Sequence, residues 1–429
     1  MNSRNNKIIE NLEKLIGKKN FLIYEKYKSN HQENFKNFSD EIFDHLIEIL
    51  NDIHKKSYSK KSWKIIIGPW YYSILNIYYF YSFCFAEKNN INQKIKKLVS
   101  KLRLNKSQKV TTDFSNYINT TYSREYILIF IKAILLNNYP KLKIYKIKLT
   151  NKSFYKKLFL KFFYHLSRPK IIISRSRFKK FEQIKIYLLS KFKILCIPGF
   201  ESMFEVKSLK IEQNIRNLII KNLDVKYKYH NILKFLIYFM PSCYIENLKE
   251  YEKAGKKIIP KSDIIYSDTT YISDEIFKIQ FANLNIKRFI GQHGGNFLIY
   301  GKNQINVHES YISDKYLLWG KNNKSKLNYL SSPKINLFYL KHKSKLKEKK
   351  KYEFCYILPP LKNTNLSYLF HCLPNNLNSN KNRSNFFQKI KKNFIIKSYA
   401  EENRYSDQIN IKKLPKFFSL NKNKFSKNL

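Results

Sequence analysis

The chain has 429 residues, and 82 lysines and arginines against 31 acidic residues give it a formal net charge of +51. Domains usually contain roughly 100–200 residues, so the length suggests two domains or one large one. Hydrophobic residues make up 43% of the chain, enough for a sizeable core, which excludes global disorder. Nine glycines and eleven prolines are too few for a collagen-like or linker-dominated architecture.

The positive charge has two competing explanations. Only ten of the basic residues are arginine, and alanine occurs five times, whereas lysine, asparagine, isoleucine, tyrosine and phenylalanine are abundant. The abundant residues are those of A/T-rich codons, so we favour genomic base composition as the main cause of the charge. A selected role in binding nucleic acid is the alternative, because 33 tyrosines and 33 phenylalanines are available for base stacking.

The five cysteines are widely spaced and no pair shows a CxxC spacing, which favours free or buried thiols over a disulfide framework or a zinc site. Residues 1–20 contain no hydrophobic core of a secretory signal. We therefore expect a cytoplasmic protein.

Two segments of the amino-terminal half have clear patterns. Residues 42–53 have a helical hydrophobic period, with Ser39 or Asp40 expected as N-cap. Residues 65–86 form a run of 22 residues without a charge. Polar and amphipathic side chains in that run favour a buried element over a membrane contact or a span, and we expect a strand to Ile67, a turn at Gly68-Pro69 and then a helix.

From about residue 165, short apolar strands alternate with helical stretches. This alternation predicts an α/β fold with a Rossmann-like parallel sheet across roughly 165–320. Residues 207–222 are expected to be helical, as is 273–282. The expected strands are residues 169–174, 192–197, 263–267, 287–292 and 316–319.

The segment Gln292-His293-Gly294-Gly295 is the most informative candidate for chemistry. Glycine is scarce in this chain, yet two adjacent glycines follow a predicted strand and a histidine. Paired glycines at the carboxyl end of a parallel strand let backbone N–H groups approach a ligand, and a histidine there can act as a general base or contact a phosphate. A tight turn with a structural histidine is the alternative.

Two further places carry candidate polar residues. His308, Glu309 and Asp314 could form an acid/base set, but capping a helix over 306–312 is the favoured interpretation. Glu201 follows a predicted strand and Pro198-Gly199, where it could accept a hydrogen bond from a sugar hydroxyl. The chain contains no P-loop, GxGxxG, HExxH, GxSxG or DxD-like aspartate pair, which disfavours P-loop nucleotide hydrolases, zinc proteases, serine hydrolases and metal-dependent sugar transferases.

Several blocks resemble a bacterial family of transferases encoded in O-antigen and surface-polysaccharide gene clusters. SWKIIIGPW at 62–70 is similar to a "YWRILLGPW" block of that family. GQHGG at 291–295, followed by His308-Glu309, Ser313-Asp314 and Leu318-Trp319-Gly320, resembles its most distinctive block. Residues 240–246, 264–268 and 274–278 are also similar to that family, and the order and spacing agree from about 57 to 400.

The resemblance implies a GT-B-like arrangement, with two Rossmann-like domains facing across a cleft. It also implies metal-independent transfer from a nucleotide-activated sugar onto a glycan, with no further cofactor. His293 would be the catalytic residue. The substrate-binding residues would be Gln292, Gly294, Gly295, His308, Glu309, Asp314 and Glu201.

The expected domains are 1–325, a Rossmann-like acceptor-side domain with a helical extension, 326–351, a basic linker, and 352–429, a partial second α/β domain. Residues 396–405 resemble a family stretch after which we expect about a hundred more residues, so the chain looks truncated at its carboxyl end and an inactive remnant is an alternative. The expected partners are a nucleotide sugar, a glycan or lipid-linked glycan acceptor and, peripherally, the anionic inner face of the cytoplasmic membrane. No specific nucleic acid is expected.

Overall fold

The fold was analysed in a computed structural model of the full chain. The residues that it describes are 8, 11–12, 15, 35, 37–86, 90–102, 107–113, 116–117, 124–143, 145–151, 158, 169–174, 178, 180–197, 204–210, 215–223, 228–256, 262–267, 275–282, 286–291, 304–317, 354–357, 394–397 and 418–421.

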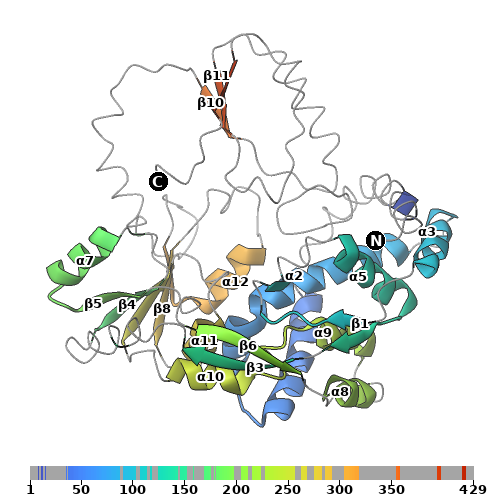
Figure 1. The fold of residues 1–429 in the computed structure, drawn as a ribbon, viewed down its shortest axis with the longest axis horizontal. Helices are drawn as coiled ribbons and strands as arrows, with labels where there is room; N and C mark the ends of the chain where they lie inside the picture. The colour runs from blue at the N-terminus through green and yellow to red at the C-terminus, as the bar shows by residue number, and fades with distance from the viewer. Residues whose placement is uncertain are drawn as a thin grey trace.

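A five-stranded parallel sheet forms the α/β part of the structure (Figure 1). Its strands lie in the order β5-β4-β7-β8-β9, and every neighbouring pair is parallel. The bounds are β4 Ile171–Ser174, β5 Ile194–Ile197, β7 Ile264–Ser267, β8 Lys287–Gly291 and β9 Lys315–Leu317. The sequence-based prediction of a parallel α/β sheet is therefore confirmed, with each of the five strands inside or within one residue of its expected range.

The strand order contains one reversal of direction. From β4 the chain moves outward to β5, then returns to the other side of β4 and continues through β7, β8 and β9. Right-handed crossovers then place the helix after β4 on one face of the sheet and the helices after β7 and β8 on the other. Figure 1 shows this arrangement, with α7 (Lys180–Leu189) on one side and α12 (Gln304–Ile312) on the other.

The two faces of the sheet belong to different hydrophobic clusters. Ile172, Leu195, Ile265 and Ile290 lie in the main core, whereas the alternate side chains of the same strands lie in a smaller cluster. That smaller cluster contains Ile173, Tyr266, Leu317 and Phe178, with Ile186 of α7 packed against it. The period-two alternation of the strands thus separates a large helical layer from the face against which Ile186 of α7 packs, while Tyr187 of the same helix belongs to the main core.

The helix α2 (Lys60–Ala86) runs through the large helical layer and contacts α5 (Arg124–Leu136), α9 (His230–Phe239), α11 (Glu275–Ala282) and α12. Every residue from 63 to 75 is buried. The prediction of a buried element is confirmed here, but the predicted strand to Ile67 and turn at Gly68-Pro69 are wrong, because the helix continues through Pro69. Packing on all sides outweighs the local preference of β-branched residues and proline for other structure.

Two other expectations need correction. Residues 37–54 are helical, so Ser39 and Asp40 lie inside the helix instead of capping it. The segment predicted to be a helix over 207–222 is divided between β6 (Phe204–Lys210), which pairs antiparallel with β3 (Tyr145–Asn151), and α8 (Ile215–Leu223). Residues 204–210 form a strand because they pair with β3. That partner lies more than fifty residues earlier in the chain, so no local sequence pattern indicates the pairing.

The remaining elements lie around this framework or form separate sheets. Helices α3 (Asn90–Lys101) and α10 (Leu248–Lys256) belong to the helical layer, while β1 (Ser107–Lys109) and β2 (Lys141–Lys143) form a parallel pair. A second parallel sheet has the order β10-β11-β12, with bounds Phe354–Ile357, Phe394–Lys397 and Phe418–Asn421. The linker predicted at 326–351 lies outside the described residues, and the predicted domain division stays a prediction. Among the described residues, no helix is both long and apolar enough to cross a membrane.

Candidate active site

The carboxyl edge of the five-stranded sheet is the first candidate for a ligand site. Strands β4 and β7 are neighbours in the middle of the sheet, and the chain leaves them in opposite directions. Loops that diverge from such a reversal point leave a crevice at the carboxyl ends of the strands, which is where open α/β sheets bind ligands. Ser174 and Ser267, the last residues of these two strands, lie opposite each other and are buried.

The predicted catalytic loop follows the next strand of the same edge. Strand β8 ends at Gly291, and its neighbour β7 carries Ser267. Gln292, His293, Gly294 and Gly295 come immediately after in the chain and lie outside the described residues, as does Glu201. Their roles therefore stay predictions, but the strand that precedes the first four is adjacent to the reversal point.

His308 lies far inside the protein, in the middle of α12. Its ring packs edge-on against Tyr72 of α2, with centroids 5.8 Å apart, and lies directly against Gly68. Burial, followed by the positive charges of Lys278 and Lys64, lowers the pKa of His308 to about 3. The imidazole is therefore neutral at physiological pH and fills the space between α12 and α2.

Glu309, the next residue of α12, connects the helix to the sheet. Its side chain is buried and accepts a hydrogen bond of 2.8 Å from the hydroxyl of Tyr316 in β9. Burial, followed by the adjacent carboxylate of Glu309, raises the pKa of Tyr316 far above its ordinary value. The pair fixes α12 against β9 from the main-core face of the sheet.

Asp314 lies beside the amino end of β8, whereas Gly291 is at the carboxyl end of that strand. One of its carboxylate oxygens accepts a hydrogen bond of 2.6 Å from the backbone N–H of Arg288, near the start of β8, and the other lies 3.0 Å from the Lys61 ammonium. Partial burial raises the pKa of Asp314, but the Arg288 N–H and Lys61 outweigh this and hold it below its ordinary value. The structure thus brings His308, Glu309 and Asp314 together on α12 and its end, but gives each of them a contact that holds elements together.

A buried ion pair lies beside His308. The ammonium of Lys278 in α11 donates to Glu275, at 2.9 Å, and to the hydroxyl of Tyr244, at 3.2 Å. Burial raises the pKa of Glu275 to about 7, although the neighbouring Lys278 opposes that rise. The backbone carbonyl of Tyr244 lies 2.9 Å from Nε2 of His54, so Tyr244 connects the ion pair to the amino-terminal helices.

A second buried ion pair supports the same region. Arg216 of α8 donates two hydrogen bonds to the carboxylate of Glu246, at 2.6 and 2.8 Å, and its third nitrogen donates to the carbonyls of Ile237 and Tyr238 at the end of α9. Both side chains are buried, with 0% and 1% of their surface exposed. The two bonds to Glu246 hold the guanidinium in place. Its third nitrogen satisfies carbonyls at the end of α9, where the helix supplies no further N–H donors.

No role was predicted from the sequence for Glu275, Lys278, Tyr244 or Lys64. The sequence nevertheless contains a sign that Glu275, Lys278 and Lys64 have buried partners. An acid and a lysine three residues apart interrupt an otherwise apolar helix at 275–282, and Lys64 interrupts the apolar run of α2. Charged residues inside apolar helices are rarely buried without partners. Lys64 indeed pairs with Asp40 at 2.9 Å and lies over the ring of Tyr311 at 4.0 Å.

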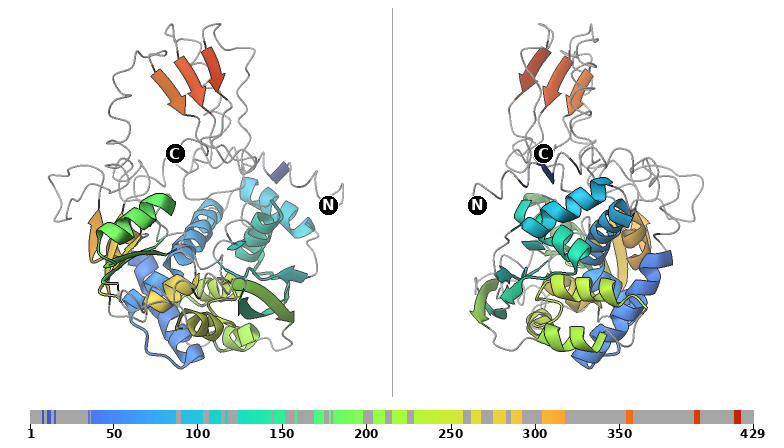
Figure 2. Two further views of the ribbon diagram at one scale, coloured as in Figure 1. Left: turned by 60° about the vertical axis from the view of Figure 1, so that its left-hand side comes forward. Right: turned by 90° about the vertical axis from the view of Figure 1, so that its right-hand side faces the viewer.

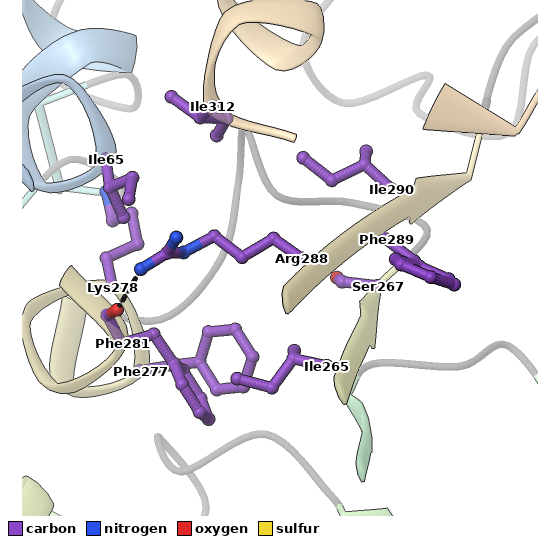
Figure 3. A pocket seen from close by; sticks show the side chains of 10 residues that line it. All are labelled: Ile65, Ile265, Ser267, Phe277, Lys278, Phe281, Arg288, Phe289, Ile290 and Ile312. Carbon is purple, nitrogen blue, oxygen red and sulfur yellow. Dashed lines mark hydrogen bonds between the residues drawn. The ribbon is translucent and has the colours of Figure 1, made fainter. Parts of the chain in front are cut away.

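Between α11, α2 and the sheet lies a small cavity of about 30 Å³ (Figure 3). Arg288 projects into it and donates a hydrogen bond of 2.7 Å to the carbonyl of Phe281. Lys278 and Ser267 line it together with apolar side chains. A volume of this size holds one or two water molecules, whereas ligand sites occupy several hundred cubic ångströms, so a nucleotide sugar would not fit there. In the described part of the chain, no group of three or more His, Cys, Asp or Glu side chains is arranged to hold a metal ion.

Comparison with known proteins connects this architecture to an enzyme class. No curated protein matches the chain, and neither does any solved structure. Residues 24–429 match a protein family described as LIC12162 family transferase. Because that match covers nearly the whole length, the chain belongs to the LIC12162 family of transferases.

Proposed function

We propose that this transferase moves a sugar from a nucleotide-activated donor onto a bacterial surface glycan, such as O-antigen or capsule, in a GT-B-like arrangement of two domains. The family supplies the transferase class. The observation that carries the finer proposal is the reversal of strand order between β4 and β7, with GQHGG beginning at the last residue of the adjacent strand β8. Such an edge suits the phosphates and ribose of a nucleotide.

The roles at this edge follow from the chemistry of the residues. Ser174 and Ser267 are buried at the strand ends, so they would form the floor of the site and would not themselves contact the diphosphate. Gly294 and Gly295 would expose backbone N–H groups to the same phosphates, and Gln292 would contact the donor. Glu201, four residues after the end of β5, would accept a hydrogen bond from a sugar hydroxyl.

His293 would act as the general base. In that step the acceptor hydroxyl gives its proton to His293, and its oxygen forms a bond to the anomeric carbon of the donor. The bond between that carbon and the diphosphate oxygen breaks, and the nucleoside diphosphate leaves with the electron pair. No metal ion is required by this proposal, because the backbone N–H groups would stabilise the leaving charge.

The remaining predicted substrate contacts have a different place in the proposal. His308 and Glu309 are buried, and Asp314 lies at the other end of β8, so we assign them to positioning the sheet and α12. A direct contact of any of them with the acceptor stays a prediction from the resemblance.

The test is transfer or hydrolysis by the purified chain, measured over a panel of uridine, guanosine, cytidine and thymidine sugar nucleotides with a lipid-linked acceptor. His293→Ala should reduce turnover by about 10²–10⁴-fold, the usual contribution of a general base. His230→Ala, at the start of α9, is the matched control and should keep activity. Absence of activity in the wild-type chain over the whole panel would overturn the proposed donor class, and undiminished turnover of His293→Ala would remove His293 from the mechanism.

A further inference from the structure

Helix α7 is apolar on both of its faces. On the inner side Tyr187 is buried and Ile186 packs against the smaller hydrophobic cluster of the sheet. On the outer side Phe181, Ile184 and Leu188 follow one another at spacings of three and four residues, so they lie on one face. An apolar helix face is normally buried, yet this outer face belongs to a helix at the outside of the described fold (Figure 2, left view).

The exposure of this outer face is large. Phe181 is 76% exposed, Ile184 57% and Leu188 58%, while Leu189 and Phe192 extend the face with 74% and 38%. These five residues, which we call the α7 apolar face, are most of the large exposed hydrophobic side chains in the described part of the chain. Contiguous apolar patches on soluble proteins usually mark an interaction surface.

The backbone of the turn after α7 is strained at the residue that exposes the Phe192 side chain. Lys191 and Phe192 have φ angles of 49° and 65°, in the left-handed region that glycine or asparagine normally occupies. The turn is closed by the N–H of Phe192, which donates to the carbonyl of Tyr187 at 3.0 Å. A bulky aromatic residue in this conformation is uncommon, and it places a half-exposed ring beside the apolar face.

Exposed lysines surround the α7 apolar face. Lys185 lies within the helix, and Lys191 and Lys193 lie in the turn that follows it. Lys170, also exposed, is adjacent to them, because its backbone N–H donates to the carbonyl of Lys193 at 3.0 Å. The single acidic residue of α7, Glu182, is half-buried. The surface therefore combines apolar side chains with positive charge.

We propose that the α7 apolar face and its lysines bind the surface of an anionic lipid bilayer. Aromatic and aliphatic side chains enter the boundary between headgroups and acyl chains, while lysines pair with lipid phosphates. Each lysine near an anionic surface strengthens binding about fivefold.

The position of α7 gives this contact a consequence for the transferase. The chain passes from Ser174, at the carboxyl end of β4, to Lys180, at the start of α7, in six residues. The turn with Lys191 and Lys193 lies at the other end of the helix, beside the amino ends of β4 and β5, so the lipid contact would run along α7 and come nearest to the carboxyl ends of the strands at the start of the helix. The binding itself does not depend on the proposed function and is measured without a substrate.

The experiment is co-sedimentation of the full chain with vesicles of phosphatidylcholine alone and of phosphatidylcholine with about one third phosphatidylglycerol. Ile184→Gln/Leu188→Gln removes two apolar side chains that are 57% and 58% exposed, and Leu158→Gln/Leu218→Gln is its control at 53% and 63%. Lys185→Gln/Lys191→Gln/Lys193→Gln removes the local charge, and Lys94→Gln/Lys96→Gln/Lys97→Gln on α3 removes the same charge elsewhere. The second comparison is essential, because a chain of net charge +51 could bind anionic vesicles without a defined surface.

We expect binding to anionic vesicles to fall by about tenfold or more in the α7 apolar variant and by on the order of 100-fold in the α7 lysine variant. Each control should stay within about threefold of wild type. Absence of vesicle binding, or equal losses in the matched sets, would overturn the proposal. Sedimentation velocity provides a further test. If the wild type is a dimer, and Ile184→Gln/Leu188→Gln converts it to a monomer while vesicle binding is retained, a second copy of the chain covers the face and the proposal is overturned.

Discussion

Replacing Gly68 by alanine tests the packing of α12 against α2 at a single point. A Cβ atom at position 68 would lie 2.2 Å from Cε1 and 2.6 Å from Nδ1 of His308. Carbon atoms in contact are normally 3.5–4.0 Å apart, so the methyl group would overlap the ring by more than about 1 Å. The ring is fully enclosed and lies against Tyr72, so it has little space into which it could move.

The expected effect is a difference between two opposing terms. Glycine in the interior of a helix costs about 1 kcal/mol relative to alanine, which favours the substitution. Overpacking of a tight core costs about 1–3 kcal/mol, and the overlap here places Gly68→Ala at the upper end of that range. We therefore expect Gly68→Ala to lower the free energy of unfolding by about 2 kcal/mol.

The same substitution should have the opposite sign when His308 is absent. His308→Ala alone leaves a cavity and should cost about 2–5 kcal/mol, as large-to-small core substitutions do. In that background the alanine at 68 meets no ring, so it should stabilise by about 1 kcal/mol. The coupling free energy between the two positions is then about 3 kcal/mol.

The assay is guanidinium denaturation followed by the fluorescence of Trp63 and Trp70, which are buried in α2 on either side of Gly68. If Gly68→Ala is as stable as the wild type, or if the effects of the two substitutions simply add, the ring of His308 does not lie against Gly68. The assignment of His308 to packing would then be wrong, and a substrate contact would have to be reconsidered.

Two further predictions concern buried charge. With its pKa lowered to about 3, His308 is neutral in the folded chain, whereas in the unfolded chain it gains a proton as the pH falls below about 6.5. The free energy of unfolding should therefore fall by up to about 1.4 kcal/mol per pH unit between about pH 6.5 and pH 3. His308→Gln should lose this contribution in denaturation curves measured across that window, and identical slopes would refute it. Glu246→Gln should cost about 3–5 kcal/mol because it leaves Arg216 buried without its carboxylate, and the double variant Arg216→Met/Glu246→Met should lose less than the single one in the same assay.

The sheet could be predicted from the sequence because its strands are short, apolar and separated by polar turns. Ile171–Ser174 and Ile264–Ser267 are buried on both faces, which a continuous apolar run indicates. Strand order is a different matter. The positions of β4 and β7 beside each other depend on contacts between residues about ninety positions apart, which no local pattern contains.

Pro69 shows why local rules failed in α2. A proline inside a helix removes one backbone hydrogen bond and usually ends or bends the helix, and the isoleucines before it favour a strand. The helix persists because the surrounding helices bury every residue from 63 to 75, and the free energy of that burial exceeds the local cost. Such compensation depends on tertiary packing, so it is invisible to a reading of neighbouring residues.

The contacts among the motif residues could not be predicted, for a similar reason. The resemblance drew attention to residues 62–70, 240–246, 274–278, 308–309 and 313–314 as separate blocks. The structure shows that residues from these blocks meet around α2, where His308 packs on Gly68 and Lys278 bonds Glu275 and Tyr244. Their spacing in the sequence contains no sign that they form one cluster.

The burial of these motif residues decides which of them can be given a catalytic role. A catalytic group must contact its substrate, yet His308, Glu309, Glu275 and Lys278 are at most 6% exposed. Charged residues are costly to bury, and in this cluster Glu275 and Lys278 pair within α11, Lys278 also donates to the Tyr244 hydroxyl, and Glu309 accepts from the Tyr316 hydroxyl of β9. Such a network fixes how α2, α11 and α12 lie against the sheet, and thereby where β7 and β8 end. The motif residues of this transferase thus include a buried set that positions the strand ends, and the GQHGG segment, which follows one of those strands in the sequence, stays the proposed contact with the substrate.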